Sequence, residues 1–140
     1  MLMRFFRADI LLNDTSPCCF VWLELAEKGA YDRRAIYSPD DMRGLVAYAH
    51  ERGVRIMIEF DVPGHGSWGK GMPELMGCEV VLDPTQNSTY TFLRDFLSEM
   101  ADIFTDEYMF LGGDEVQTSC WDANKRIASW LKVHHLEGAG

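Results

Sequence analysis

The most regular pattern of apolar positions follows Ser38 and predicts an amphipathic helix. Apolar residues recur at i, i+3, i+4 and i+7, the spacing that forms one buried stripe on an α-helix. They are Met42, Leu45, Val46 and Ala49. Ser38 suits the N-cap, Pro39 suits the first helical position, and the acids that follow favour the positive end of the helix dipole. With Arg52 in its last turn, the helix is expected to end at Gly53.

Two further patterns alternate with this helix and predict strands of a parallel sheet. Residues 54–60 (VRIMIEF) are rich in branched side chains and come directly after the helix. Residues 90–104 have helical periodicity, and a short apolar run at 108–111 follows them. The buried side of this second helix is expected to hold Phe92 or Leu93, Phe96, Leu97, Met100 and Phe104. A helix followed by a strand, repeated once, is typical of the α/β class.

The remaining segments give weaker patterns. A short strand is expected at residues 8–12, a helix at 21–28 and another helix at 124–136. Residues 1–7 are basic and apolar, but Asp9 interrupts them before the apolar core of a signal peptide develops. No targeting segment is therefore expected in this chain.

Composition limits the class of protein and of partner. The 140 residues suffice for one domain, and 47% hydrophobic with 12% aromatic residues is typical of a globular chain. The formal net charge of −9 argues against a nucleic-acid or anionic-membrane partner. No uninterrupted apolar run approaches the roughly 18 residues that a membrane span needs.

Chemically reactive side chains follow both predicted strands. Asp61 and His65 come after residues 54–60, while Asp114 and Glu115 come after residues 108–111 and two glycines. Because parallel strands present their carboxyl ends at one edge of the sheet, these four side chains are expected to converge. Two chemistries suit the set: glycoside cleavage by a carboxylic acid, or metal-assisted hydrolysis with Asp and His ligands.

The cysteines do not follow the spacing of a zinc site. Cys18 and Cys19 are adjacent, so a bond between them would be strained, and Cys78 and Cys120 stand alone in loops beside the candidate site. No Cys-x-x-Cys spacing occurs, so a structural zinc site is not expected.

Two Asn-x-Ser/Thr triplets are candidate glycosylation acceptors, at Asn13 and at Asn87. They weakly favour the secretory pathway.

The strand-end motifs resemble those of a known enzyme family. Residues 59–65 (EFDVPGH), followed by Ser-Trp-Gly at 67–69, resemble a hallmark of glycoside hydrolase family 20, the β-N-acetylhexosaminidases. Residues 111–116 (LGGDEV), followed by Cys-Trp at 120–121, resemble the catalytic signature of that family. The resemblance extends over residues 21–136, whereas residues 1–20 diverge.

The resemblance implies a fold and a reaction. The family domain is a (β/α)₈ TIM barrel, of which residues 1–140 would form an incomplete part with about three βα units. The implied activity is removal of terminal non-reducing N-acetylhexosamine, GlcNAc or GalNAc, from glycans or glycoconjugates. The mechanism would be retaining and substrate-assisted, with the 2-acetamido group of the sugar as nucleophile. A truncated, catalytically inactive fragment that acts only in sugar or subunit binding is the alternative.

The resemblance also implies individual roles. Glu115 would be the general acid and later the base for water, and Asp114 would orient the acetamido group. His65 and Asp61 would tune and orient Glu115. Further supporting or substrate-binding positions would be Trp121 and Asp14.

Finally, the resemblance implies a cellular context. The sequence is most similar to the eukaryotic lysosomal and secreted branch of the family, in which the cysteines equivalent to Cys78 and Cys120 form a disulfide. No metal ion or other cofactor is expected. A dimer, or association with the missing barrel segments, is a further expectation, because an open sheet edge favours pairing.

Overall fold

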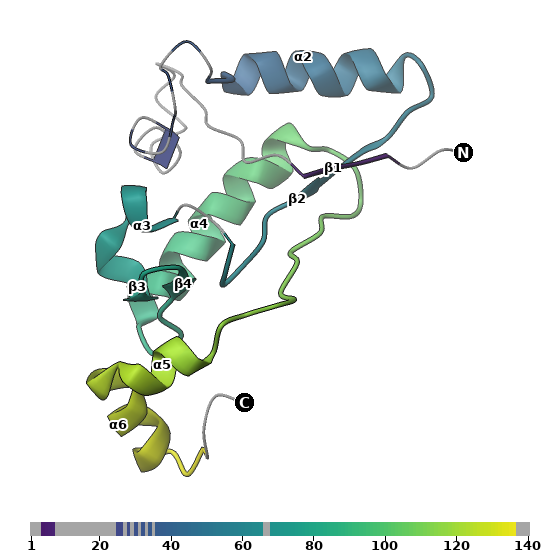
Figure 1. Cartoon of the computed structure of the whole chain (residues 1–140). Coiled ribbons are helices and arrows are strands. Elements are labelled where there is room, and N and C mark those ends of the chain that lie inside the picture. The colour runs from purple at the N-terminus through teal and green to yellow at the C-terminus, as the bar shows by residue number, and fades with distance from the viewer. Residues whose placement is uncertain are drawn as a thin grey trace.

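The computed structural model describes residues 4–7, 25, 26, 28, 30, 32, 34, 36–65 and 68–136. Its elements are helices and short strands (Figure 1). In order they are β1 (Arg4–Arg7), α2 (Pro39–His50), β2 (Ile56–Glu59), α3 (Trp68–Gly71), the 3₁₀ turn η2 (Pro73–Leu75), β3 (Met76–Cys78), β4 (Val81–Leu82), α4 (Asn87–Ile103), α5 (Ser119–Ala123) and α6 (Lys125–Val133). Within these residues, no helix is long and apolar enough to cross a membrane.

A parallel arrangement of three segments positions the strand ends. β1 pairs with β2 in parallel, in a register that sets Arg4 opposite Ile56 and Arg7 opposite Glu59. On the other side of β2, Glu59 forms a parallel bridge with Phe110. The Phe60 amide donates to the Phe110 carbonyl at 2.9 Å, and the Phe110 amide donates to the Ile58 carbonyl at 3.0 Å. The α/β class and its parallel pairing, predicted from the sequence, are thereby confirmed. The predicted strand at 108–111 is limited to this one bridge at Phe110, and the side chains of Tyr108, Phe110 and Leu111 are exposed.

Helix α2 begins where the capping residues predict. The Ser38 hydroxyl accepts from the Asp41 amide at 3.0 Å, and the Asp41 carboxylate accepts from the Ser38 amide at 2.9 Å. This reciprocal capping box satisfies two backbone donors that a helix start leaves free. Met42, Val46 and Ala49 are buried as predicted, but Leu45 is 54% exposed. The prediction for Leu45 was wrong because its position lies on the flank of the helix, away from the contact line of the other three.

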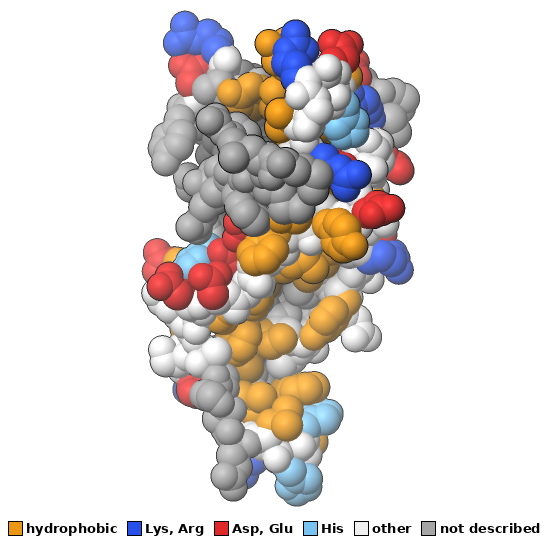
Figure 2. All heavy atoms as spheres, turned by 90° about the vertical axis from the view of Figure 1, so that its right-hand side faces the viewer, with side chains coloured by type: hydrophobic (Ala, Val, Ile, Leu, Met, Phe, Trp, Pro, Cys, Tyr) orange, Lys and Arg blue, Asp and Glu red, His pale blue; other side chains and the backbone are white. Residues whose placement is uncertain are grey.

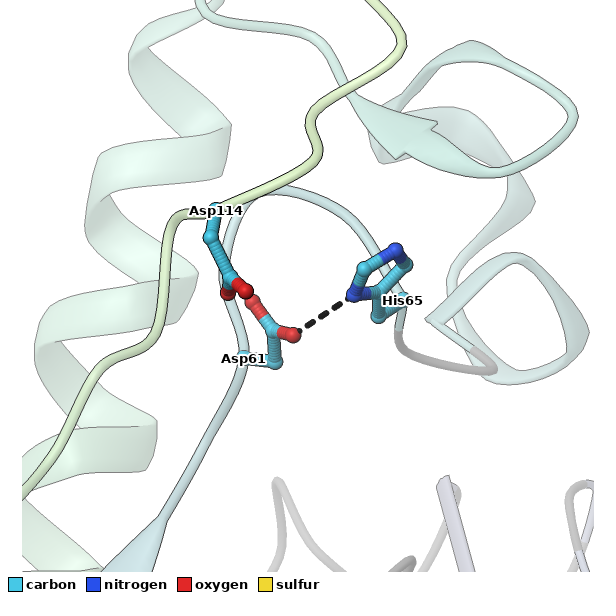
Figure 3. A group of neighbouring side chains, drawn as sticks. All are labelled: Asp61, His65 and Asp114. Atoms are coloured by element: carbon cyan, nitrogen blue, oxygen red, sulfur yellow. Dashed lines mark hydrogen bonds and ion pairs between the residues drawn. The ribbon is translucent and has the colours of Figure 1, made fainter.

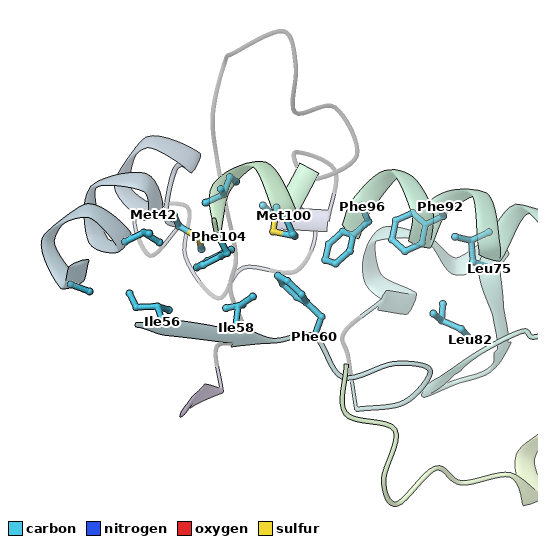
Figure 4. Close-up of a cluster of buried hydrophobic side chains, with 14 residues drawn as sticks. Met42, Ile56, Ile58, Phe60, Leu75, Leu82, Phe92, Phe96, Met100 and Phe104 are labelled. Carbon is cyan, nitrogen blue, oxygen red and sulfur yellow. The ribbon is translucent and has the colours of Figure 1, made fainter. Parts of the chain in front are cut away.

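The hydrophobic core lies between β2 and the helices α2 and α4 (Figure 4). Alternate residues of β2 are buried, so the strand turns one face to both helices. The rings of Phe60 and Phe96 meet edge to face with centroids 4.9 Å apart, a favourable geometry for aromatic pairs. Helix α4 begins at Asn87, earlier than the predicted position 90, and its buried residues include Phe92, Phe96 and Met100 as predicted.

A second packing unit joins the antiparallel pair β3–β4 to the C-terminal helices. The Trp121 indole donates to the Leu82 carbonyl at 3.0 Å, and the Asn124 amide donates to the Gly77 carbonyl at 2.6 Å. A Cβ at Gly77 would lie 2.8 Å from Ile127 Cδ1 and 3.0 Å from the Trp121 ring, so a side chain there would require these neighbours to shift. Cys78 and Cys120 form a disulfide across this contact.

Predictions for the N-terminal part have mixed outcomes. The predicted strand at 8–12 lies outside the described residues. Leu25, Ala26 and Lys28, within the predicted helix at 21–28, are helical.

Candidate active site

The first loop of the site follows β2 and holds an aspartate–histidine pair. Oδ2 of Asp61 lies 2.8 Å from Nδ1 of His65. The Asp61 side chain is 11% exposed and that of His65 is 31% exposed, so the pair is partly shielded from water. His65 has φ +52°, a left-handed conformation that is uncommon for residues other than glycine.

The second loop follows Leu111 and rests on the first. The Leu111 carbonyl accepts from the Val62 amide at 3.0 Å, which carries the parallel alignment past the end of β2. Gly112 and Gly113 then adopt φ +64° and +99°, values that favour glycine. The Gly113 amide donates to Oδ1 of Asp61 at 3.1 Å. The two loops are therefore joined through one carboxylate.

The position of Gly112 depends on Asp61 as well as on the backbone angle. A Cβ at residue 112 would lie 2.7 Å from Cγ and 3.1 Å from Cα of Asp61. Real Cβ atoms essentially never show a contact as short as the one to Cγ, so the loop can rest on Asp61 only because residue 112 has no side chain.

Three of the four side chains singled out in the sequence, Asp61, His65 and Asp114, lie together at this edge (Figure 3), and Glu115 lies beside His65. Polar atoms of Asp61, His65 and Asp114 all lie within 4.8 Å of one another. Nε2 of His65 lies 3.9 Å from Oε2 of Glu115, whose side chain is 81% exposed. A carboxylate held near an imidazole, with open access to solvent, is an arrangement suited to proton transfer to a bound molecule.

Among the described residues, Asp61, His65 and Asp114 are the one group of three that could hold a metal ion. Two members of this group already contact each other, since Oδ2 of Asp61 and Nδ1 of His65 are within hydrogen-bond distance. The set can therefore hold a cation or work as a hydrogen-bonded proton-transfer group.

The other predicted site residues do not belong to this cluster. Trp121 packs over Gly77 and donates to Leu82, in the second packing unit. Asn87 is the exposed first residue of α4. Asn13 and Asp14 lie outside the described residues. The sequence analysis did not predict that the Gly113 amide donates to Asp61. The one feature of the sequence that pointed to this contact was the pair of glycines before the two acids.

Fold and site together define a mixed α/β chain with a carboxylate–imidazole cluster at the carboxyl ends of parallel strands, the edge where active sites of this class lie. The chain belongs to glycosyl hydrolase family 20: the pattern of that family's catalytic domain matches residues 22–139. The family resemblance found in the motifs is thereby confirmed.

Individual relatives agree with this membership. The chain is 41% identical over 120 residues to beta-hexosaminidase subunit beta of Homo sapiens, which covers 78% of this chain and 22% of the relative. It is 43% identical over 112 residues to beta-hexosaminidase 3 of Arabidopsis thaliana, a match that covers 77% of this chain and 21% of the relative. The X-ray structure of Flavobacterium johnsoniae chitobiase superimposes with a TM-score of 0.74 at 30% identity, over 94% of this chain and 21% of that one. The chain thus spans 22% and 21% of the length of the two curated relatives.

Proposed function

We propose that this chain carries the catalytic centre of a β-N-acetylhexosaminidase. The reaction is hydrolysis of terminal non-reducing GlcNAc or GalNAc from glycans or glycoconjugates. The observation that supports it most directly is the adjacent pair Asp114–Glu115, held beside His65 and Asp61 in a segment that matches the family. Relatives named beta-hexosaminidase support the same activity.

The adjacency of the two acids favours a substrate-assisted mechanism. A retaining enzyme with its own nucleophile places two carboxyl groups on opposite faces of the scissile bond, about 5–5.5 Å apart. Neighbouring residues on one turn cannot easily reach both faces. The acetamido oxygen of the substrate is therefore the nucleophile.

The two acids have different roles in this proposal. Glu115, exposed and 3.9 Å from the His65 imidazole, protonates the glycosidic oxygen and then removes a proton from the attacking water. Asp114, close to Asp61 and His65, accepts a hydrogen bond from the acetamido N–H and so directs its carbonyl oxygen to the anomeric carbon. His65 and Asp61 support Glu115, and Trp121 remains a proposed supporting residue, as does Asp14.

The proposal extends to the fold and its surroundings. We assign residues 1–140 to part of a (β/α)₈ barrel with about three βα units, residues 21–136 being the family segment. Parallel pairing of three segments with α2 and α4 between them supports this assignment. Hydrophobic side chains gather on the face along which the segment between α4 and α5 runs (Figure 2). Tyr108, Phe110 and Leu111 of this segment are exposed. Such a face supports association with further barrel segments or a dimer.

A lysosomal or secreted location is part of the proposal. The Cys78–Cys120 disulfide supports an oxidising compartment. The Asn87 triplet, whose acceptor side chain is exposed, supports N-glycosylation there. Asn13 is the second proposed acceptor.

The test uses N,N′-diacetylchitobiose, whose sugar leaving group needs protonation, and matched glutamate variants. Glu115→Gln is expected to lower kcat about 10²- to 10⁴-fold, the usual contribution of a general acid. The loss is expected to shrink with leaving groups that need no protonation. Glu107→Gln, a change at another exposed glutamate, is the control and should leave kcat unaltered. An unchanged rate in Glu115→Gln would refute the assignment.

Two further measurements separate this proposal from the other hypotheses. Strong chelation should not reduce the rate of sugar hydrolysis. If Asp61, His65 and Asp114 instead held a metal ion that assists hydrolysis, chelation would abolish activity. If the unmodified chain shows no turnover, the chain is instead the non-catalytic sugar- or subunit-binding alternative. Titration with N-acetylglucosamine, followed by NMR, then measures the sugar binding that this alternative requires.

A further inference from the structure

Leu82 of β4 is bonded through its backbone to segments on both sides of the site. Its amide donates to the Pro63 carbonyl at 3.0 Å, and its carbonyl accepts from the Trp121 indole at 3.0 Å. Pro63 belongs to the first loop, just before His65, whereas Trp121 lies in α5, which follows the loop that holds Glu115. One buried residue therefore connects the two segments whose side chains face each other in the site.

The residue after Leu82 fixes this junction in the fold. Leu82 and Asp83 are both 0% exposed. The Asp83 amide donates to the Leu75 carbonyl at 2.8 Å. Its carboxylate accepts from the Thr85 amide at 2.8 Å and from Nε2 of Gln86 at 3.1 Å. Because a buried polar network with its partners in place is rigid, Leu82 is a fixed point for both segments.

The chain between Glu115 and Trp121 is folded into tight turns. The Thr118 amide donates to the Val116 carbonyl at 2.9 Å, and the Trp121 amide donates to the Thr118 carbonyl at 2.9 Å. A segment with such internal hydrogen bonds moves as a unit more than an extended loop does. The place of Trp121 therefore limits where Glu115 can lie.

Two other anchors hold α5, but they connect it to β3. They are the Cys78–Cys120 disulfide and the hydrogen bond from Asn124 to the Gly77 carbonyl. Of these three anchors, in the described part of the chain, the Trp121 bond is the one that ends on a residue bonded to the first loop. The indole N–H is thus the group that relates the second loop to the first.

We propose that Trp121 is a positioning residue that acts through Leu82 on both loops of the site. It sets the separation of the His65 imidazole and the Glu115 carboxyl group, which is 3.9 Å from Nε2 to Oε2. The Trp121 ring faces Gly77, where a Cβ would lie 3.0 Å from it, so this side chain is directed into the β3–β4 unit rather than toward a sugar. Its effect on turnover rests on the proposed function, whereas its effect on the two loops does not.

The central experiment is NMR on the full ¹⁵N-labelled chain. In the unmodified chain, the Trp121 indole proton should exchange slowly with solvent, because it is bonded to a buried carbonyl. In Trp121→Phe the ring remains aromatic but the N–H donor is lost, so the resonances of His65 and Glu115 should shift. Rapid exchange of the indole proton would overturn the proposal, and this measurement needs no variant. Unchanged His65 and Glu115 resonances in Trp121→Phe would overturn it as well.

A second replacement separates the hydrogen bond from the packing of the ring. The amino acid 3-benzothienylalanine at position 121 keeps the two-ring shape of tryptophan and lacks the N–H. It should shift the resonances of His65 and Glu115 as Trp121→Phe does. Resonances that respond to Trp121→Phe but not to this isostere would assign the effect to packing and refute the role of the indole N–H.

Another tryptophan provides a matched control. Trp130 lies in α6, and 37% of it is exposed. Trp130→Phe is the same chemical change away from the Leu82 junction. It should leave the resonances of His65 and Glu115, and kcat, unchanged.

Kinetics with two substrates provide the arm that depends on the proposed function. Trp121→Phe is expected to lower kcat for N,N′-diacetylchitobiose by about 10- to 100-fold, because a small misplacement of a catalytic group has an effect of this size. The loss should be much smaller for p-nitrophenyl N-acetyl-β-glucosaminide, whose leaving group needs little protonation. Equal losses on both substrates would refute the positioning of the acid, since general destabilisation lowers both rates alike. Shifted resonances in a chain without turnover would refute the proposed function and leave the role of Trp121 in place.

Discussion

Removal of the Cys78–Cys120 disulfide is expected to destabilise the chain strongly. The bond joins the end of β3 to helix α5 and closes a loop across a sequence separation of 42. For a loop of this length, the chain-entropy relation gives a contribution of roughly 4 kcal/mol at 25 °C. Since domains unfold with about 5–15 kcal/mol in total, the double variant Cys78→Ser, Cys120→Ser should lose a large share of its stability.

The assay is equilibrium unfolding in urea, followed by tryptophan fluorescence and extrapolated to water. Reductant should lower the stability of the unmodified chain to that of the double variant and should leave the variant unchanged. A loss below about 1 kcal/mol would refute the loop-closure reasoning, because it lies well under the value that the relation gives. Alkylation of all four cysteines in the native chain without reductant would refute the bond itself.

Two further predictions concern charged side chains away from the site. Arg126 pairs with the fully buried Asp83. Arg126→Met should therefore lower the free energy of unfolding, measured in urea, by about 1–3 kcal/mol. This loss is smaller than for a fully buried pair because the Arg126 side chain is half exposed. Arg94→Met, at an exposed pair, is the control and should stay within about 0.5 kcal/mol. Hydrogen bonds from the Ser38 amide and then its hydroxyl hold the pKa of Asp41 below its ordinary value of 3.8. A depressed pKa stabilises the folded state at pH values above the ordinary pKa. The unmodified chain should therefore be more stable than Asp41→Asn at neutral pH, and this difference should vanish as the pH falls through the lowered pKa. A difference that persists at lower pH would contradict this prediction.

The elements that the sequence predicted well have strong local signals. Helix α2 begins at its capping residues, and the buried face of α4 follows the apolar spacing. Strand β2 and the Phe110 segment each follow such a helix, so the parallel alignment and the shared strand edge could be inferred from order alone.

The elements that the sequence did not predict depend on distant contacts. β1 at Arg4–Arg7 is a short basic and aromatic segment, and its partner in the sheet is β2, far along the chain. β3 and β4 are too short to show a period of two, and they are held by Trp121, Asn124 and the disulfide. Such contacts leave no periodic signal in the residues themselves.

The double glycine before the acids shows why two motifs were more informative together than apart. From the sequence alone, Gly112 and Gly113 indicated only a turn. In the structure each has a separate reason: residue 112 has no room for a Cβ above Asp61, and residue 113 donates its amide to that same carboxylate. A strand end that places Asp61 beneath this turn requires glycine at 112, and that glycine allows the next amide to reach Oδ1. The EFDVPGH and LGGDEV motifs therefore depend on each other physically, and their joint presence in one chain specifies a single site.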